Sequence, residues 1–338
     1  MQAHDRQTHD SAAVSIDTDR ELIILAAPGP DGYYDAVQDD IVAFHIRYAE
    51  AISAHDDVIV LSGPNLHARY VEALGDDRVA LIPMADIWMR DFTPLNAVNP
   101  VTMRYSPAGQ GGGRTGRREA KFVQSELEDM LQAASLKLPE STLINDGGNF
   151  VDDYAGRVVL SRKFLRDNQL SENEGRVAVR ETTGANHIAF IEADEQGGLE
   201  HADGVVAFIG PNQLVINRYP EDAAYADTLK ADLRAGLPGV AIHEIVTPYD
   251  GSDIYDVRFG SACGLYTNML VTPQRIYFPQ FGIAEDHEAL EQLRRWTDRE
   301  VIPVQSSQVC RMGGGVRCMS WQLRGEPAAR LKTYLSDR

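Results

Sequence analysis

The sequence predicts an α/β fold. Short apolar runs rich in Val, Ile and Leu alternate with longer segments in which apolar residues recur every three or four positions. This alternation is typical of proteins in which strands and helices follow one another along the chain. Because no linker-like segment interrupts the pattern, we expect a flexible segment over residues 1–18 and a single continuous domain over residues 19–338.

Seven segments are expected to form strands, because each is short, apolar and bounded by turn residues. In chain order they are residues 21–27, 57–63, 78–83, 157–162, 204–210, 213–219 and 275–281. Four longer segments are expected to form helices, because their apolar residues repeat at the spacing of one helix face. These are residues 41–55, 121–135, 224–237 and 285–300.

Five reactive or charged residues recur at similar intervals. Asp91, Asp146, Asp203, Asp253 and Cys318 are separated by 55, 57, 50 and 65 residues, and each follows or begins a predicted strand. This spacing suits about five similar units of strand and helix around a shared centre, each of which contributes a loop or strand end to one site. Chance spacing of the five markers is the alternative.

The composition disfavours some classes of partner. Of 338 residues, 50 are acidic and 32 are basic, which gives a formal net charge of −18 at pH 7. This charge disfavours nucleic acid and anionic membranes and is compatible with a cationic small molecule. No run approaches the roughly 20 apolar residues of a membrane span, and the N-terminus lacks the apolar segment of a signal peptide. We therefore expect a cytoplasmic protein with no nucleic-acid or membrane partner.

Three cysteines are too few for a disulfide framework, and none belongs to a CxxC pair of the kind that binds structural zinc. We therefore expect reduced cysteines. Cys263 and Cys310 are expected to be small buried apolar side chains, since neither follows a glycine turn as Cys318 does.

The segment GQGGGRTGRREAK at residues 109–121 is rich in glycine and arginine, as phosphate-binding loops are. It lacks both the Lys-Ser/Thr pair of a P-loop and the G-x-G-x-x-G spacing of a dinucleotide site. We predict a mobile surface loop that leads into the following helix. A lid over a site remains the alternative.

The motif HADG places His201 and Asp203 two residues apart, just before an apolar strand. In an extended segment both side chains would point to the same face, so a general acid/base and an anionic ligand would share one pocket. A surface turn is the alternative. The same pair could also bind a metal ion, although the sequence has no H-E-x-x-H motif.

The motif GGGVRC places three glycines immediately before Cys318. Glycine permits positive φ angles and close approach of the backbone, so this turn could present Cys318 to a pocket. A cysteine becomes a nucleophile when a nearby cation or backbone dipole favours its thiolate. The alternative is an unreactive buried cysteine.

The motif DIWMRD surrounds Trp88 with Asp86, Arg90 and Asp91. The two carboxylates either form surface ion pairs with Arg90 or bind a planar guanidinium through paired hydrogen bonds. The motif alone does not decide between them.

Taken together, the motifs resemble the agmatine deiminase and bacterial peptidylarginine deiminase family of guanidine-modifying enzymes. The resemblance covers about residues 80–325 in the family's order. The matching patterns are D-x-W-x-R-D-x-x-P at Asp86, Trp88, Arg90, Asp91 and Pro94, G-G at Gly147 and Gly148, H-x-D at His201 and Asp203, and G-G-G-x-x-C at Gly313, Gly314, Gly315 and Cys318. Asn268, the PQFG stretch at 279–282 and Asp286 also look like the family's segment between histidine and cysteine.

The resemblance implies a five-bladed pseudo-symmetric α/β propeller that needs neither a metal nor an organic cofactor. By analogy, Asp91 and Asp203 clamp a guanidinium, Cys318 attacks its central carbon, and His201 protonates the departing ammonia before it activates water. The other residues implied to bind substrate are Trp88, Arg90, Asp86, Asp146, Asn149 and Asn268. The buried carboxylates would raise the pKa of Cys318, so we expect a reactive thiolate mainly once the cationic substrate is bound. Family members are often oligomeric, so a homo-oligomer is also expected.

The chain departs from the family pattern at two positions near the site. Asp146 stands where Glu is usual, and Arg317 stands where the agmatine enzymes commonly have His. The W-x-P opening and the T-E-C-L-L run typical of agmatine deiminases are also missing. Agmatine is therefore the first substrate to consider, while peptidylarginine or another guanidine, amidino transfer to an amine, and silent guanidine binding stay open.

Overall fold

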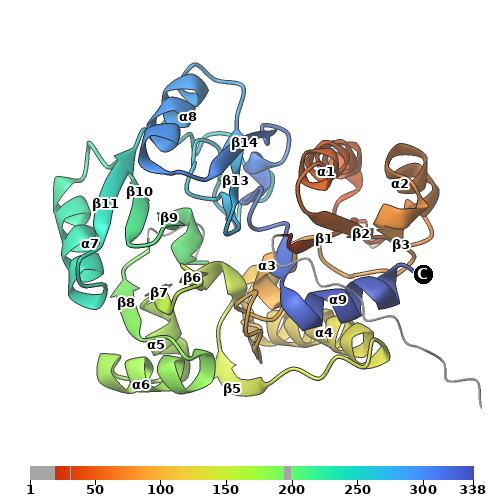
Figure 1. Cartoon of the computed structure of the whole chain (residues 1–338), viewed down its shortest axis with the longest axis horizontal. Helices are drawn as coiled ribbons and strands as arrows, with labels where there is room; N and C mark the ends of the chain where they lie inside the picture. The colour runs from red at the N-terminus through yellow and green to blue at the C-terminus, as the bar shows by residue number, and fades with distance from the viewer. Residues whose placement is uncertain (1–19, 31, 194–198) are drawn as a thin grey trace, which may run out of the picture.

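The computed structural model describes residues 20–30, 32–193 and 199–338. In these residues the strands form five separate sheets, and helices connect strands within and between them. Figure 1 shows the sheets following one another around the middle of the molecule, with the larger helices toward the outside. The expected α/β class is confirmed. The flexible segment predicted for residues 1–18 lies outside the described residues.

The first sheet joins the two ends of the described chain. Its order is β15-β1-β2-β3, with β1 antiparallel to β15 and parallel to β2. The strands are β15 (Trp321–Leu323), β1 (Leu22–Ala26), β2 (Asp57–Leu61) and β3 (Val79–Ala80), and helices α1 (Gln38–Ser53), α2 (His67–Leu74) and α9 (Gly325–Leu335) pack against them.

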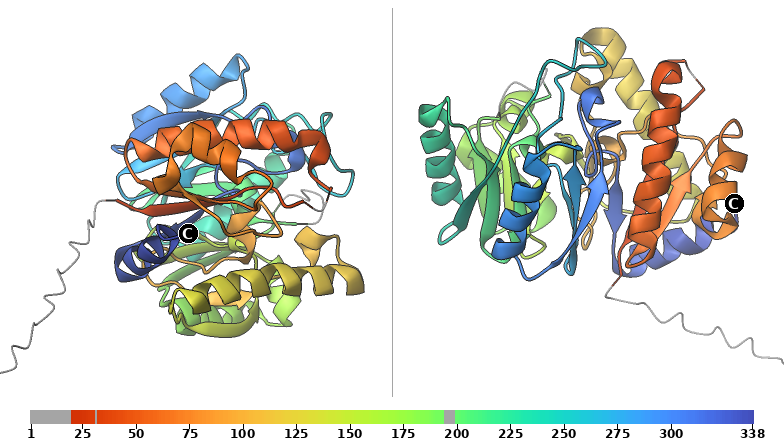
Figure 2. Two further views of the ribbon diagram at one scale, coloured as in Figure 1. Left: turned by 90° about the vertical axis from the view of Figure 1, so that its right-hand side faces the viewer. Right: turned by 90° about the horizontal axis from the view of Figure 1, so that it is seen from above.

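The first sheet is covered on both faces, which explains the uninterrupted apolar run in β1. Ile23 and Leu25 pack in one buried cluster with α1, whereas Leu22, Ile24 and Ala26 pack in another with α4 (Gly113–Ala133) and α9. Successive residues of a strand point to opposite faces, so a strand buried on both sides must be apolar throughout. Figure 2 shows α1 on one side of β1 and both α4 and α9 on the other.

Three further sheets repeat one pairing pattern, in which a middle strand is antiparallel to the strand before it and parallel to the strand after the helix. The third unit has β6 (Val151–Asp152), β7 (Arg157–Ser161), α5 (Lys163–Asn168), α6 (Glu172–Thr183) and β8 (His187–Ile191). The fourth has β9 (Val206–Gly210), β10 (Gln213–Asn217), α7 (Ala223–Gly236) and β11 (Ala241–Ile245). The fifth has β12 (Leu270–Val271), β13 (Arg275–Gln280), α8 (Glu285–Trp296) and β14 (Glu300–Gln305).

The second unit is a reduced form of this pattern. Strands β4 (Thr102–Arg104) and β5 (Glu140–Ile144) are parallel and are joined by α4, while a single antiparallel bridge between Leu95 and Val101 takes the place of the hairpin. The shared pairing of the five sheets agrees with the five similar units that the marker spacing indicated. All seven expected strands occur, with ends trimmed by a few residues.

Short turns connect the longer elements, some within one unit and others between successive units. They are helix α3 (Met89–Phe92) and the 3₁₀ turns η1 (Asp35–Val37), η2 (Asp76–Arg78), η3 (Ala108–Gln110), η4 (Gly147–Asn149), η6 (Ala202–Gly204) and η7 (Cys310–Met312). Three of them, α3, η4 and η6, carry motif residues and contact one another in sequence.

Two element predictions need correction. The expected loop at 109–121 is mostly helical, because α4 begins at Gly113. Its N-terminus is set by Gly111, Gly112 and Gly113, which have positive φ angles, and Gly116 allows the first turn to lie against the carbonyl oxygens of Pro107 and Gln110. The helix expected to reach residue 300 ends at Trp296, and residue 300 already starts β14.

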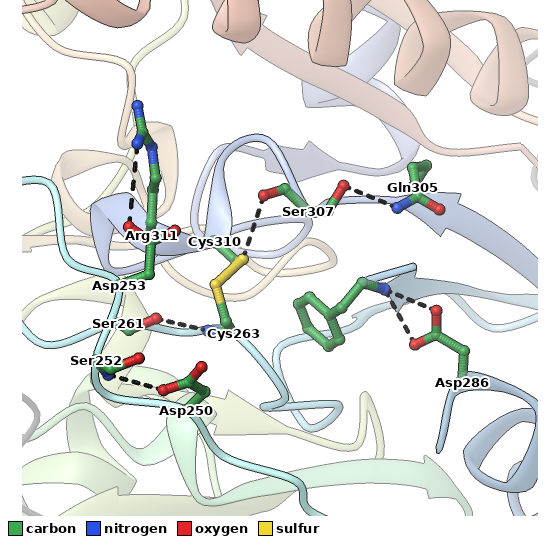
Figure 3. The surroundings of a disulfide bond; sticks show 11 residues. Asp250, Ser252, Asp253, Ser261, Cys263, Asp286, Gln305, Ser307, Cys310 and Arg311 are labelled. Carbon is green, nitrogen blue, oxygen red and sulfur yellow. Dashed lines mark hydrogen bonds and ion pairs between the residues drawn. A yellow bond between two sulfur atoms is a disulfide. The ribbon is translucent and has the colours of Figure 1, made fainter. Parts of the chain in front are cut away.

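The expectation of three reduced cysteines is wrong for two of them. Cys263 and Cys310 form a disulfide across a sequence separation of 47 residues (Figure 3), and Cys318 is free and buried. Sequence spacing carries no information on this pairing, because it depends on two loops that meet only in the folded chain. Among the described residues, no helix is both long and apolar enough to cross a membrane.

Candidate active site

Residues from turns at five places in the chain surround one cavity. Six of the ten predicted catalytic and substrate-binding residues line it, and they are Trp88, Asp91, His201, Asp203, Asn268 and Cys318. Aromatic and apolar side chains form much of the remaining wall, among them Tyr33, Tyr34, Tyr255, Phe259, Leu265 and Met312. The polar groups are thus gathered at one end of a cavity whose other walls are largely apolar, as is typical of small-molecule sites.

Cys318 lies at the polar end of the cavity. Its Sγ accepts a hydrogen bond from Asn268 Nδ2 at 3.0 Å and lies 3.8 Å from Asp203 Oδ2. Burial raises the pKa of the Cys318 thiol well above its usual range, and the charges of Asp203 and Asp91 add to this effect. The Asn268 hydrogen bond and the Arg317 charge act in the opposite direction without cancelling it. Without a bound cation, the group at this position is therefore a thiol at neutral pH.

The glycine turn before Cys318 makes room for Trp88. A Cβ on Gly314 would lie 2.5 Å from Trp88 Cζ3 and 2.8 Å from the Cys318 Cβ, closer than side-chain atoms can approach. Gly313 has a φ of 97°, a left-handed conformation that favours glycine. The Gly-rich motif therefore lets the indole ring and the cysteine lie against the same stretch of backbone.

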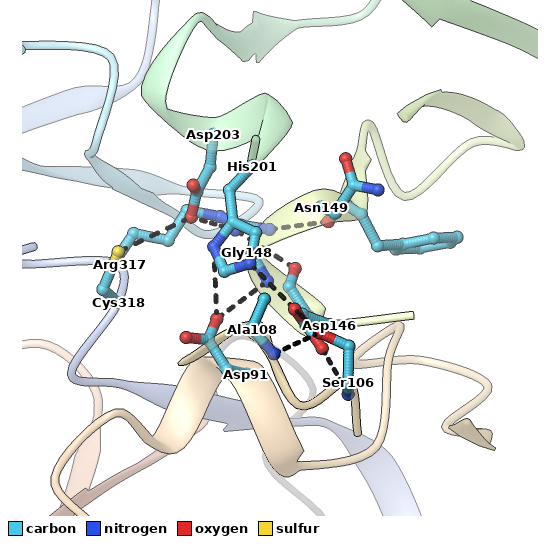
Figure 4. Close-up of polar contacts among 12 residues, drawn as sticks. Asp91, Ser106, Ala108, Asp146, Gly148, Asn149, His201, Asp203, Arg317 and Cys318 are labelled. Carbon is cyan, nitrogen blue, oxygen red and sulfur yellow. Dashed lines mark hydrogen bonds and ion pairs between the residues drawn. The ribbon is translucent and has the colours of Figure 1, made fainter. Parts of the chain in front are cut away.

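His201 is held between two carboxylates (Figure 4). Its Nε2 is 3.1 Å from Asp146 Oδ2, and its Nδ1 is 3.7 Å from Asp91 Oδ1. Burial lowers the pKa of His201, but the Asp91 charge and the contact with Asp146 outweigh it and raise the pKa to about 9. At neutral pH the imidazole therefore carries a proton that it can donate.

The two carboxylates that hold His201 differ in their own surroundings. Burial raises the pKa of Asp91 to about 7, and His201 only partly opposes this rise. Burial also acts to raise the pKa of Asp146, but the hydrogen bonds from His201 and Ser106 outweigh it and lower the pKa. Ser106 donates to Asp146 through both its backbone N and its Oγ, each at 2.7 Å. Asp146 is thus a fixed anion, whereas Asp91 titrates near neutrality.

The Gly147–Gly148 turn brings these groups within contact distance. A Cβ on Gly148 would lie 2.4 Å from His201 Nδ1 and 2.9 Å from Asp91 Oδ1, and a Cβ on Gly147 would overlap the carbonyl oxygen of Arg90. The Gly148 N–H also donates to Asp91 Oδ1 at 3.2 Å. The turn therefore requires glycine at both positions, because backbone replaces side chain at the contact with His201 and Asp91.

Arg317 contacts Asp203 from beside the cysteine. Its Nη1 is 2.7 Å from Asp203 Oδ2, and its Nη2 donates to the carbonyl oxygen of Phe150 at 2.7 Å. The side chain is buried. The sequence marked this position only as a departure from the family pattern, and the pattern gave no indication that the side chain would reach Asp203.

Four predicted substrate-binding residues do not line the cavity. Asp86 lies behind Tyr34, whose hydroxyl donates to Asp86 Oδ1 at 2.9 Å. Arg90 points to Gln322 Oε1 at 3.0 Å. Asp146 lies behind His201, as described above, and Asn149 Oδ1 accepts a hydrogen bond from the backbone N of Ser161 at 2.7 Å. The side chains of Asp86 and Asp146 thus contact residues that line the cavity, whereas those of Arg90 and Asn149 contact residues that do not. The contact of all four with substrate stays a prediction.

The marker Asp253 does not reach the cavity, which corrects the idea that every marker contributes to the site. Its side chain is exposed and lies 4.0 Å from Arg311. The fifth unit contributes Asn268 instead, from the turn before β12. Among the described residues, no group of three or more His, Cys, Asp or Glu side chains has a geometry that could hold a metal ion.

The irregular segment at residues 246–265, here called the wall loop, forms one side of the cavity with Tyr255, Phe259 and Ala262. The Cys263–Cys310 disulfide and the hydrogen bond from Ala262 N to Cys310 O at 2.8 Å fasten this loop to η7 (Figure 3). Since η7 leads directly into the glycine turn before Cys318, the disulfide connects the wall loop with the segment that carries the cysteine.

Comparison with known proteins gives a consistent result. A protein of Pectobacterium atrosepticum named "Putative agmatine deiminase" is 26% identical over 82% of this chain and 84% of its own length. A protein of the same name from Lactococcus lactis is 24% identical over 89% of this chain and 92% of its own. Both matches extend across nearly the whole fold described above.

Solved structures share the fold. The agmatine deiminase of C. jejuni superposes with a TM-score of 0.74 at 17% identity, over 91% of this chain and 94% of that one. The agmatine deiminase of Enterococcus faecalis superposes with a TM-score of 0.73 at 18% identity, over the same shares. The model of the Porphyromonas-type peptidyl-arginine deiminase family matches residues 18–323, which include all the residues that line the polar end of the cavity. The chain therefore belongs to the Porphyromonas-type peptidyl-arginine deiminase family, a family of hydrolases that act on carbon–nitrogen bonds.

Proposed function

We propose that this protein hydrolyses the guanidino group of a small cationic substrate, in the first place agmatine, to give N-carbamoylputrescine and ammonia. The observation that carries the proposal is the convergence of Cys318, His201, Asp91 and Asp203 on one cavity. The names of the relatives in P. atrosepticum, L. lactis and C. jejuni support agmatine as the substrate to test first.

The electrostatics of the cavity favour a planar cation. Asp91 and Asp203 line it, and carboxylates bind guanidinium groups through directed, charge-assisted hydrogen bonds. Asn268 Oδ1 is buried and has no hydrogen-bond partner among the described residues, so it can accept one further N–H of the substrate. Trp88 offers an aromatic face to the same cation.

The first half of the reaction forms a covalent intermediate. Binding of the guanidinium cation offsets the negative charge of the carboxylates, which lowers the pKa of Cys318, and the thiol proton leaves to solvent. The thiolate attacks the central guanidino carbon, and the bond to one terminal nitrogen breaks as His201 gives that nitrogen its proton. Ammonia departs and a thiouronium on Cys318 remains. The pKa of His201, raised to about 9, suits it to this role as an acid.

The second half returns the enzyme to its starting state. His201, now neutral, takes a proton from water as the water attacks the thiouronium carbon. The carbon–sulfur bond then breaks as the hydroxyl proton of the tetrahedral intermediate passes to the departing sulfur, which releases the ureido product and restores the Cys318 thiol beside a protonated His201. Asp146 and Asp91 stabilise the protonated imidazole at both stages, since they contact opposite ring nitrogens. The proposed chemistry uses only side chains of this chain, with neither a metal nor an organic cofactor.

We further propose that the five sheets are the blades of a five-bladed α/β propeller in one catalytic domain. Its support is the repeated pairing of the sheets and the position of the turns α3, η4 and η6 between successive units. In such an arrangement each unit delivers a turn to the common centre, where the cavity lies.

The test is ammonia and ureido-product formation from agmatine, arginine, an arginine-containing peptide and smaller guanidines, with wild type beside Cys318→Ala. We expect turnover of agmatine by the wild type and none by the variant, which should still bind agmatine. Product formation that needs an added amine would instead establish amidino transfer. Binding without turnover of any compound, equal in both proteins, would contradict the proposal.

A further inference from the structure

The arginine next to the nucleophile occupies an unusual position. Arg317 directly precedes Cys318, yet its side chain is 7% exposed and turns inward. There it contacts three residues from two other parts of the chain: Nη1 contacts Asp203 Oδ2 at 2.7 Å, Nη2 contacts the carbonyl of Phe150 at 2.7 Å, and Nη1 also lies 3.4 Å from the carbonyl of Gly147. Figure 4 shows the side chain reaching from the cysteine toward Asp203.

These contacts fix the two turns that hold the catalytic groups. Gly147 and Phe150 belong to the η4 turn and the residue after it, and the N–H of Gly148 in that turn binds Asp91. Asp203 belongs to η6, which follows His201. One buried guanidinium therefore joins the segment that positions Asp91 to the segment that carries Asp203 and His201. A planar group with five donors can make all these contacts at once, whereas an ammonium lacks this fixed fork of donors.

The contact with Asp203 also determines how that carboxylate can meet a substrate. Arg317 takes Oδ2, the oxygen that lies 3.8 Å from Cys318 Sγ. Asp203 nevertheless lines the cavity. Its orientation is thus set from behind by Arg317, and a substrate guanidinium meets a carboxylate already held in place.

The charge of Arg317 acts on the nucleophile as well. Asp203 from η6 and Asp91 from α3 face Cys318 and disfavour its thiolate, and Arg317 opposes them. His201 lines the same cavity as a further cation at neutral pH. Arg317 also interacts electrostatically with Asp152 and with Arg90, whose charges are opposite in sign to each other. Unlike a histidine, an arginine keeps its charge at every working pH.

We propose that Arg317 is a positioning residue: it holds Asp203 against Cys318 and supplies a permanent positive charge beside the nucleophile. The inference rests on the proposed function, in which Cys318 is the nucleophile and Asp203 binds the guanidinium. It gives the departure from the family pattern at this position a defined role.

The test measures the rate of Cys318 alkylation by iodoacetamide against pH, without substrate, in the full chain. The chain has three cysteines and two of them form the disulfide, so Cys318 alone is open to the reagent. For Arg317→Gln we expect the midpoint of the profile to rise by about one pH unit. Arg317→Lys, which keeps the charge, should stay within about 0.3 of a unit of wild type and raise the KM for agmatine instead.

Two further variants keep the test independent of folding defects. Arg275→Gln removes another largely buried arginine, whose Nη1 lies 3.4 Å from Asp56 Oδ1. Neither residue lines the cavity, so this variant should leave the alkylation midpoint unchanged. If Arg317→Gln does not fold because Asp203 loses its partner, the Asp203→Asn variant is compared with the double variant Asp203→Asn/Arg317→Gln. In both of these proteins residue 203 carries no charge. The double variant should again titrate about one pH unit above its single parent.

The outcomes separate this inference from the proposed function. An unchanged midpoint in a folded Arg317→Gln protein, or in the double variant against its parent, overturns the role of Arg317 even if agmatine is hydrolysed. A midpoint that rises as expected, in a protein that hydrolyses no guanidine, supports the Arg317 charge and contradicts only the proposed reaction.

Discussion

Two regions of the cavity are built in different ways. One is the catalytic floor, which consists of Asp91, Asp146, Gly148, His201 and Cys318. These residues lie in or beside short turns, are buried, and form polar contacts with other parts of the chain. The wall loop contains no helix or strand and exposes Val257 at 90%. A fixed geometry suits bond making and breaking, whereas a loop without regular secondary structure can adapt to the rest of a substrate.

The difference also shows in what holds each region. The floor depends on backbone contacts that only glycine allows and on ion pairs inside the protein. The wall loop depends on one disulfide and on hydrogen bonds such as Tyr255 N to Arg311 O at 2.8 Å. Changes in the floor should therefore act on kcat, and changes in the wall loop should act on KM.

The largest effect is expected from Gly148→Ala. The added Cβ would meet His201 Nδ1 at 2.4 Å and Asp91 Oδ1 at 2.9 Å, so both catalytic side chains must move. We expect kcat/KM for agmatine to fall about a hundredfold or more and the free energy of unfolding to fall by about 1–3 kcal/mol. Gly210→Ala is the matched control, because its nearest neighbour would be an ordinary 3.8 Å away. Equal activity of the two variants would show that the floor is not rigid.

A smaller effect on rate, with a change in pH dependence, is expected from Asp146→Asn. Asp146 is one of the three carboxylates, with Asp91 and Asp203, that raise the pKa of His201 to about 9. Without its charge that pKa should fall by about one unit, so the alkaline limb of the kcat profile should move to lower pH. Ser106→Ala, which removes only one donor to Asp146, serves as the comparison and should move the limb less. An alkaline limb that stays in place would exclude His201 as its origin.

The wall loop is tested by Cys263→Ser. Loss of the disulfide frees this loop from η7, so we expect the KM for agmatine to rise about threefold to tenfold while kcat changes less than about twofold. Wild type treated with dithiothreitol should show the same kinetics, and Cys310→Ser should match Cys263→Ser. A fall in kcat at constant KM would mean that the disulfide supports the floor rather than the wall.

The smallest effect concerns Glu21, a buried carboxyl group that does not line the cavity. Burial raises the pKa of Glu21 to about 8, and the hydrogen bond from Gln322 at 2.6 Å opposes the rise only in part. The folded state thus binds this proton more tightly than the unfolded state, so the stability it contributes is complete below about pH 4.5 and is lost as pH rises toward 8.

Glu21→Gln should therefore gain stability relative to wild type as pH rises through this window, by at most about 1.4 kcal/mol per pH unit. Urea unfolding at several pH values measures the difference, and the exposed Glu50→Gln controls for the loss of one negative charge. A difference between Glu21→Gln and wild type that stays constant with pH would contradict the raised pKa.

The success of the sequence predictions depended on whether a feature was local. Strands such as 213–219 and 275–281 were recognisable because their apolar runs are continuous. Helix α6 was missed because it buries only Gly175 and Val179, too few residues for a visible apolar face. Strand β5 was missed because none of its residues is buried. Their places are set by packing against neighbouring units, which a short window of sequence does not contain.

In the site, sequence motifs predicted the reacting groups but not their partners. The four residues predicted to be catalytic line one cavity, because the fold brings together the short turns in or beside which they lie. The pairing of Cys263 with Cys310 and the inward turn of Arg317 were not foreseeable. Each depends on two segments far apart in the chain, and spacing along the sequence does not determine distance in space.

The sequence by itself determined the α/β class and seven of the fifteen strands of the described residues, and it predicted the nucleophile, acid and carboxylates that the proposed chemistry requires. The fold class and the strands follow from local periodicity, whereas the site residues follow from motifs that resemble those of the family. Only the tertiary structure decided which partner each charged side chain meets. Asp146 contacts His201, Asp203 contacts Arg317, and Arg90 points to Gln322. The pKa of a buried group is set by the charges within a few ångströms of it, and those neighbours are chosen by the packing of the whole fold.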